Sequence, residues 1–112
     1  MQIIAKPAIL IQLWESREID FTELMKIVVD IHQKTLAIDG DMHADLKKLL
    51  LDNGSHQKDL WGANIYPMID KFDRLEFTSF INIRPSQGNR GMEVKDAATR
   101  ELMQKIVMHL LV

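Results

Sequence analysis

Cysteine is absent from this chain of 112 residues. Its absence excludes a disulfide framework, a thiolate nucleophile and a metal site with cysteine ligands. An excess of positive charge is also missing, because the net charge is -2 at pH 7. This balance argues against a general nucleic-acid-binding protein, whose affinity depends on neutralising phosphates. We therefore expect no nucleic-acid partner.

Long apolar runs are missing as well. The run from Ala8 to Leu13 is short and is followed by charged residues, so we predict no signal peptide. No stretch approaches the length of a transmembrane helix, and we expect a cytoplasmic protein with no membrane partner. The remaining composition, 46% hydrophobic and 27% charged, is typical of a globular protein. The length predicts a single domain over residues 1–112.

A short strand can begin at the N-terminus, and strand patterns occur in several places after it. Apolar and polar residues alternate between Met25 and Ile31, which predicts a half-buried strand that returns as Thr35 to Ile38. A helix also fits the start of this segment, so residues 16–28 stay open between helix and strand. The stretches LWGANIYP and LEFTSFINIRP predict two further strands, which Pro67 and Pro85 terminate.

The apolar faces of these two strands predict their register. Pairing Ile65 with Phe77, and Trp61 with Ile81, places apolar residues on one face. The opposite face then collects the polar and aromatic side chains of Asn64, Tyr66, Glu76, Thr78, Phe80, Asn82 and Arg84. This face could meet solvent, a ligand or a second subunit.

Three helices complete the prediction. The first runs from about Pro7 to Glu15, and the second follows Asp41 as N-cap and ends at Asn53-Gly54. The third follows Asp96 as N-cap, in the segment KDAATRELMQKIVMHLLV. The predicted fold class is α+β, an antiparallel sheet of four or five strands with about three helices packed on one face.

The segment INIRPSQGNRGMEV suggests an anion site. Arg84 would project from a strand end, two glycines allow a tight loop, Arg90 adds charge, and a helix begins soon afterwards. The alternative is that Arg84 pairs with Glu76 or Asp59 and that the glycines only make turns. The candidate ligand-binding residues are Asn64, Asn82, Arg84, Asn89 and Arg90.

The segment DGDMHAD carries acidic residues beside His43. Such a cluster could hold a hard cation or perform acid–base chemistry. However, acidic residues also stabilise the first turn of a helix, and residues two apart on a helix do not face each other. We assign no metal and no cofactor. His43 is the best single candidate for a general base, and whether the protein is an enzyme stays open.

The pieces VVDI, LAIDGDMHADLKKLLLDNGS, QKDLWGANIYP and INIRPSQGNR occur in this order between Val28 and Arg90. Together they resemble a small prokaryotic family classed as a domain of unknown function. The patterns WGxNIYP and INIRPxxGN are its specific elements. Where this chain has Asp39 and Asp41, the resembling sequences tend to have glycine and glutamate. The resemblance implies no activity, substrate or catalytic residue.

Our leading hypothesis is a protein that binds a small anionic molecule through the polar sheet face and the loop after Arg84. We also expect a homodimer. The alternative is a module for protein–protein interaction or self-association with no small ligand, which would use the sheet face or an open edge strand.

Overall fold

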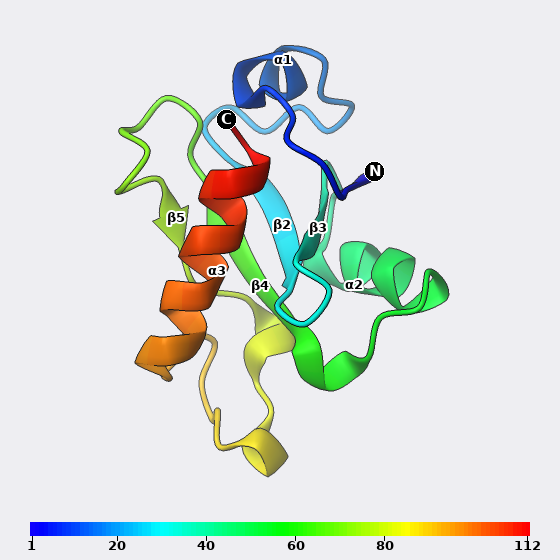
Figure 1. The fold of residues 1–112 in the computed structure, drawn as a ribbon, viewed down its shortest axis with the longest axis vertical. Coiled ribbons are helices and arrows are strands. Elements are labelled where there is room, and N and C mark those ends of the chain that lie inside the picture. The colour runs from blue at the N-terminus through cyan, green and yellow to red at the C-terminus, as the bar shows by residue number, and fades with distance from the viewer.

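The computed structural model describes all 112 residues and contains one antiparallel sheet and three α-helices, an α+β fold (Figure 1). The strands are β1 (Gln2–Ile4), β2 (Met25–Asp30), β3 (Thr35–Ile38), β4 (Leu60–Ile65) and β5 (Leu75–Glu76). The α-helices are α1 (Leu10–Glu15), α2 (His43–Asp52) and α3 (Ala97–Leu110). The short 3-10 helices are η1 (Gln57–Asp59), η2 (Phe80–Asn82) and η3 (Pro85–Gln87). The predicted fold class is confirmed, and no helix is both long and apolar enough to cross a membrane.

The sheet has the strand order β1-β3-β2-β4-β5, so β2 is its central strand. The hairpin of β2 and β3 pairs Ile27 with Ile38 and Asp30 with Thr35. On its other side β2 pairs with β4, where Ile27 lies opposite Ala63. The strand prediction that starts at Met25 is confirmed, and the helical alternative is not adopted.

The helices divide between the two faces of the sheet, which corrects the prediction that all of them pack on one face. Helices α1 and α3 pack on the face that carries Ile27. Helix α2 packs on the opposite face, where Leu46 and Leu50 join Val28 and Ala37 in a second core (Figure 1). Val28 and Ala37 are both fully buried. The central strands are apolar on both faces, so each face needs its own helical cover.

The ends of the helices match the sequence patterns in part. The Asp96 carboxylate caps α3 as predicted, by accepting a hydrogen bond from the Thr99 N–H at 3.0 Å. No side chain caps α2, so the predicted cap Asp41 was wrong. Asp41 precedes the true N-cap position, and its backbone oxygen accepts from Lys26 Nζ at 2.8 Å. Gly54 follows α2 with a φ of 99°, the left-handed region that glycine adopts without steric cost.

The segment predicted as a long third strand forms only the short strand β5. Its pairing with β4 places Ile65 opposite Leu75, so the predicted pairing of Ile65 with Phe77 was wrong. After β5 the chain turns away, and the Phe77 carbonyl accepts from the Val94 N–H at 3.0 Å. The place of a strand beside β4 is taken by η2 and by the side chain of Asn82.

Candidate functional site

Asn82 is fully buried, and its side chain substitutes for strand backbone beside β4. Its Oδ1 accepts from the Gly62 N–H at 2.8 Å, and its Nδ2 donates to the Gly62 carbonyl at 2.9 Å. Nδ2 also donates to the Met92 carbonyl at 3.1 Å. A carboxamide carries the same kinds of donor and acceptor as a peptide group, so it satisfies the β4 backbone where β5 has ended.

Asn89 fixes the far end of the same loop. Its Nδ2 lies 2.8 Å from the Asn82 carbonyl and 3.0 Å from the carbonyls of Gly91 and Glu93. Its Oδ1 accepts from the Lys95 N–H at 2.9 Å. Because Asn89 is 3% exposed, these contacts occupy its amide completely.

Arg84 is 8% exposed and connects the loop to the start of β4. One terminal nitrogen donates to the Gln57 carbonyl at 2.6 Å, and the other donates to the Leu60 carbonyl. The guanidinium carbon lies 3.9 Å from the ring centroid of Trp61, in cation–π geometry. Arg84 forms no ion pair, so the pairing with a carboxylate that we considered is absent. Burial lowers the pKa of this guanidinium.

The structure brings Asn82, Arg84 and Asn89 into one internal network, and it places the other two predicted ligand-binding residues outside that network. Arg90 is exposed beyond the loop. Asn64 lies on β4, where its Nδ2 donates to Glu76 at 2.8 Å and its Oδ1 is buried without a partner. Within the network only the Nε of Arg84 lacks a partner. The network therefore shapes the loop and leaves few free polar groups on it.

His43 lies at the start of α2 and contacts β4. Its Nε2 is 2.8 Å from the Ala63 carbonyl, so Nε2 carries a proton and donates it. Burial lowers the pKa of His43, the hydrogen bond to Ala63 partly opposes this, and the charge of Lys26 lowers the pKa further. His43 lines a hollow of about 250 Å³ with Met42 and Phe80. This hollow shares no residue with the one beside the loop after Arg84.

A hollow of about 580 Å³ opens beside the loop after Arg84. This loop lies at the lower end of the molecule in Figure 1. Segments from η1, β4, η3 and the start of α3 form its wall. The lining residues that bear on its chemistry are Lys58, Trp61, Gln87, Gly88, Lys95 and Asp96. Gly88 has a φ of 78°, which lets the chain turn back so that Asn89 pairs with Arg84.

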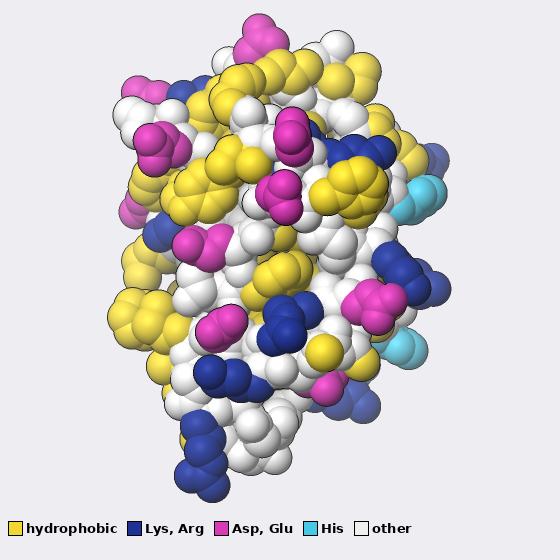
Figure 2. Space-filling model, turned by 90° about the vertical axis from the view of Figure 1, so that its left-hand side faces the viewer, with side chains coloured by type: hydrophobic (Ala, Val, Ile, Leu, Met, Phe, Trp, Pro, Cys, Tyr) yellow, Lys and Arg dark blue, Asp and Glu magenta, His cyan; other side chains and the backbone are white.

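The charges around this hollow favour an anion. Lys58 and Lys95 line it. Lys58 forms no ion pair, and Lys95 forms a weak one with the exposed Glu93, at 3.9 Å. Asp96 also lines it, and the two hydrogen bonds that its carboxylate accepts from Thr99 lower its pKa and keep it negative, so two ammonium groups and one carboxylate line the hollow. Figure 2 shows basic side chains at the lower end of one face, with acidic and basic side chains interspersed above them.

Trp61 contributes an unpaired donor to the same wall. Its side chain is 7% exposed, and its indole N–H is buried without a hydrogen-bond acceptor. Buried indole N–H groups usually find a partner. Solvent does not reach this nitrogen, so an acceptor atom in the hollow would contact it only if the wall moved.

Residues 2–110 match the family described as protein of unknown function, DUF5674. The chain belongs to this family. The comparisons with curated proteins and with solved structures found no match. The resemblance seen in the sequence is confirmed, and its two specific pieces touch each other. Trp61 and Gly62 of WGANIYP contact Arg84 and Asn82 of INIRPSQGN, so both pieces belong to one interaction network.

Sequence reasoning located the loop but missed Lys58, Lys95 and the Trp61 N–H. Lys58 reaches the site because Gln87 Nε2 donates to its carbonyl at 3.0 Å, a contact between residues distant in sequence. No local pattern marks such a pairing. The sequence analysis placed Trp61 on the apolar face of the sheet, and its indole N–H was the one signal that this side chain also needs a hydrogen-bond acceptor.

Proposed function

We propose that this member of the family binds a small anionic molecule in the hollow beside the loop after Arg84. The carrying observation is that Lys58 and Lys95 share one wall with Trp61, whose buried indole N–H has no partner within the chain. An unsatisfied buried donor costs about 1–3 kcal/mol, and a ligand oxygen would recover this energy. The two ammonium groups supply charge-assisted hydrogen bonds to the same ligand.

The roles of the predicted residues change in this proposal. Asn82 and Asn89 hold the loop, and Arg84 orients the indole of Trp61 by stacking on it. The Arg84 charge has no carboxylate partner, so it adds to the positive potential at the hollow. His43 lines a different hollow and has no part in this binding.

Thermal unfolding of the full chain tests the proposal, with inorganic phosphate, pyrophosphate, citrate and AMP as probes. A ligand that binds only the native state stabilises it by about 2.7 kcal/mol at a hundredfold excess over its Kd. The double variant Lys58→Gln/Lys95→Gln should lose this stabilisation and stay folded, since both side chains are exposed. Lys47→Gln on α2 removes a charge from the opposite side of the sheet and serves as the control.

A variant of Trp61 sharpens the experiment. Trp61→Phe keeps an aromatic ring under Arg84 but removes the N–H, so it should weaken binding of the stabilising probe about tenfold. Arg84→Ala would be a poor test, because it removes two internal hydrogen bonds and changes the fold of the loop. The proposal fails if none of the four probes raises the midpoint, or if the double lysine variant responds like the wild type.

Self-association is the second candidate function, and the exposure of Phe80 favours it. Phe80 is 77% exposed and Met42 is 54% exposed, and both line the hollow beside His43. Aromatic residues and methionine are enriched in interface cores. Light scattering across a concentration series should then detect a dimer that Phe80→Ser abolishes. A monomer at every concentration would exclude this function.

A further inference from the structure

The hollow beside the loop after Arg84 is far larger than an inorganic anion. Its volume of about 580 Å³ lies within the roughly 300–1,000 Å³ typical of small-molecule sites. A bare phosphate ion would fill only a small part of this space. The ligand of the function proposed above, on which this inference rests, should therefore carry a body beside its anionic group.

The wall around this body is polar. Of the nine residues that line the hollow, only Ile31 and Trp61 are hydrophobic. Trp61 is 7% exposed and Arg84 stacks on its ring, so the wall offers little aromatic surface to a nucleobase. A body that fits this wall must form hydrogen bonds with it.

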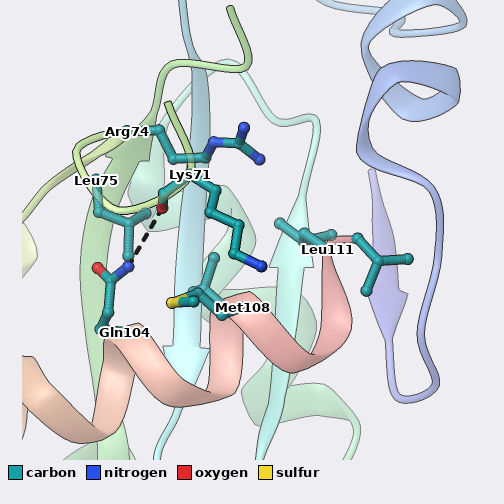
Figure 3. Close-up of a pocket in the computed structure, with 8 residues that line it drawn as sticks. Lys71, Arg74, Leu75, Gln104, Met108 and Leu111 are labelled. Carbon is teal, nitrogen blue, oxygen red and sulfur yellow. Dashed lines mark hydrogen bonds between the residues drawn. The ribbon is translucent and has the colours of Figure 1, made fainter. Parts of the chain in front are cut away.

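A second hollow, of about 260 Å³, lies between α3 and the loop that joins β4 to β5 (Figure 3). Five of its eight lining residues are hydrophobic, and Leu75 and Met108 are among them. Gln104 Nε2 donates to the Lys71 carbonyl at 3.4 Å, which holds the loop against α3. This second hollow shares no residue with the larger one, so it provides a control surface for the experiment below.

Three oxygen atoms in the wall of the larger hollow can only accept hydrogen bonds from a ligand. Both hydrogen bonds from Thr99 go to Asp96 Oδ2, which leaves the ionised Oδ1 without a partner. Thr99 Oγ1 donates its proton in one of these contacts, so it too can only accept. Gln87 Nε2 donates to the Lys58 carbonyl at 3.0 Å, which fixes the amide and leaves its Oε1 free. A ligand that presents only acceptor atoms cannot use any of the three.

We propose that the ligand is a small polyhydroxylated anion, of which a polyol phosphate is the simplest form. Its anionic group accepts from the ammonium group of Lys58 or of Lys95. Its hydroxyl groups donate to Asp96 Oδ1, Thr99 Oγ1 and Gln87 Oε1. Hydroxyl groups suit this wall better than a ligand ammonium group, because a hydroxyl can also accept from the neighbouring lysines.

A matched pair of probes, glycerol phosphate and propyl phosphate, tests the proposal in calorimetric titrations of the full chain. The two share their charge and carbon number and differ only in two hydroxyl groups. Glycerol phosphate should bind about three- to tenfold more tightly, the net gain expected from one or two neutral hydrogen bonds. Phosphoethanolamine, which carries an ammonium group in place of the hydroxyls, should bind more weakly than glycerol phosphate.

The variant Asp96→Asn tests the assigned acceptor. Asparagine is as good an N-cap as aspartate, so its carbonyl oxygen can accept from Thr99 and keep α3 folded. The free position then carries an NH₂ group, which donates and cannot accept. The preference for glycerol phosphate over propyl phosphate should shrink at least about twofold. The control Lys71→Gln, at the hollow in Figure 3, should leave this preference unchanged.

The outcomes separate this inference from the function on which it rests. Equal affinity for the two phosphates, or tighter binding of propyl phosphate, would overturn the polyol assignment and leave anion binding intact. Tighter binding of phosphoethanolamine than of glycerol phosphate would also overturn it, and so would an undiminished preference in Asp96→Asn. If neither phosphate binds and none of the four earlier probes does, the proposed function fails and this inference fails with it.

Discussion

Replacing Asn82 by alanine should remove a large part of the stability of this protein. Asn82 is fully buried, and its side chain satisfies both the N–H and the carbonyl of Gly62, which is buried as well. Each buried polar group that loses its partner costs about 1–3 kcal/mol. The third contact, to the carbonyl of the exposed Met92, can be replaced by water. We therefore expect a loss of about 3 kcal/mol out of the roughly 5–15 kcal/mol typical of a domain.

Urea unfolding followed by tryptophan fluorescence measures this loss. The midpoint should fall while the slope of the free energy with urea stays the same, because the extent of unfolding is unchanged. Asn53→Ala is the matched control, since Asn53 makes one side-chain hydrogen bond at the exposed end of α2. It should cost less than about 0.5 kcal/mol. A loss below about 1 kcal/mol for Asn82→Ala would refute the idea that this amide substitutes for a strand.

The isosteric variant Asn82→Asp gives a second measurement of the same contact. An aspartate keeps the acceptor for the Gly62 N–H, but its other oxygen faces the carbonyls of Gly62 and Met92. Burial and these carbonyls should raise the pKa of the new carboxyl above its unfolded value. Stability relative to the wild type should therefore recover as the pH falls through that raised pKa and decline as the pH rises. A variant whose stability parallels the wild type at every pH would contradict the assigned hydrogen bonds.

Three further predictions follow from the same region. In Gly62→Ala the new methyl would lie 2.6 Å from the Ser79 Cβ, so the urea midpoint should fall by the equivalent of about 1–3 kcal/mol, and Ser79→Gly in the same chain should restore part of it. Arg84→Lys should cost about 2 kcal/mol in the same assay, because an ammonium group cannot bridge two carbonyls while it stacks on Trp61. His43 should titrate below its ordinary pKa of 6.5 in NMR spectra. Because the folded state favours neutral His43, its contribution to the free energy of unfolding is fully present above pH 6.5 and is lost as the pH falls toward the folded pKa. The variant His43→Gln should remove this pH dependence of stability.

The elements that were predicted correctly are those with strong local patterns. The alternation after Met25 identified β2, and the apolar stripe with its cap at Asp96 identified α3. The position of α2 on the second face was missed, although Val28 and Ala37 interrupt a simple alternation of apolar and polar residues. Both are buried under α2, and this interruption was the signal that the central strands are covered on both faces.

The prediction after β5 failed for a different reason. The residues from Phe77 to Ile83 have the composition of a strand, and the sequence contains no break before Pro85. In the structure, the carboxamide of Asn82 satisfies the β4 backbone, and the chain is free to turn into η2. Strand propensity does not reveal that a side chain takes the place of a neighbouring strand, because the decisive contact joins residues 20 positions apart.

The sequence by itself determined the fold class, the central hairpin, the capped C-terminal helix and the position of an unusual polar loop, because each depends on residues close together along the chain. Only the tertiary structure decided what the polar groups of that loop contact. Asn82, Arg84 and Asn89 are buried, and a buried polar group needs a partner that can be either a ligand or distant backbone. Here the partners are backbone carbonyls and amides, so we propose that Lys58 and Lys95 beside the loop contact the ligand instead.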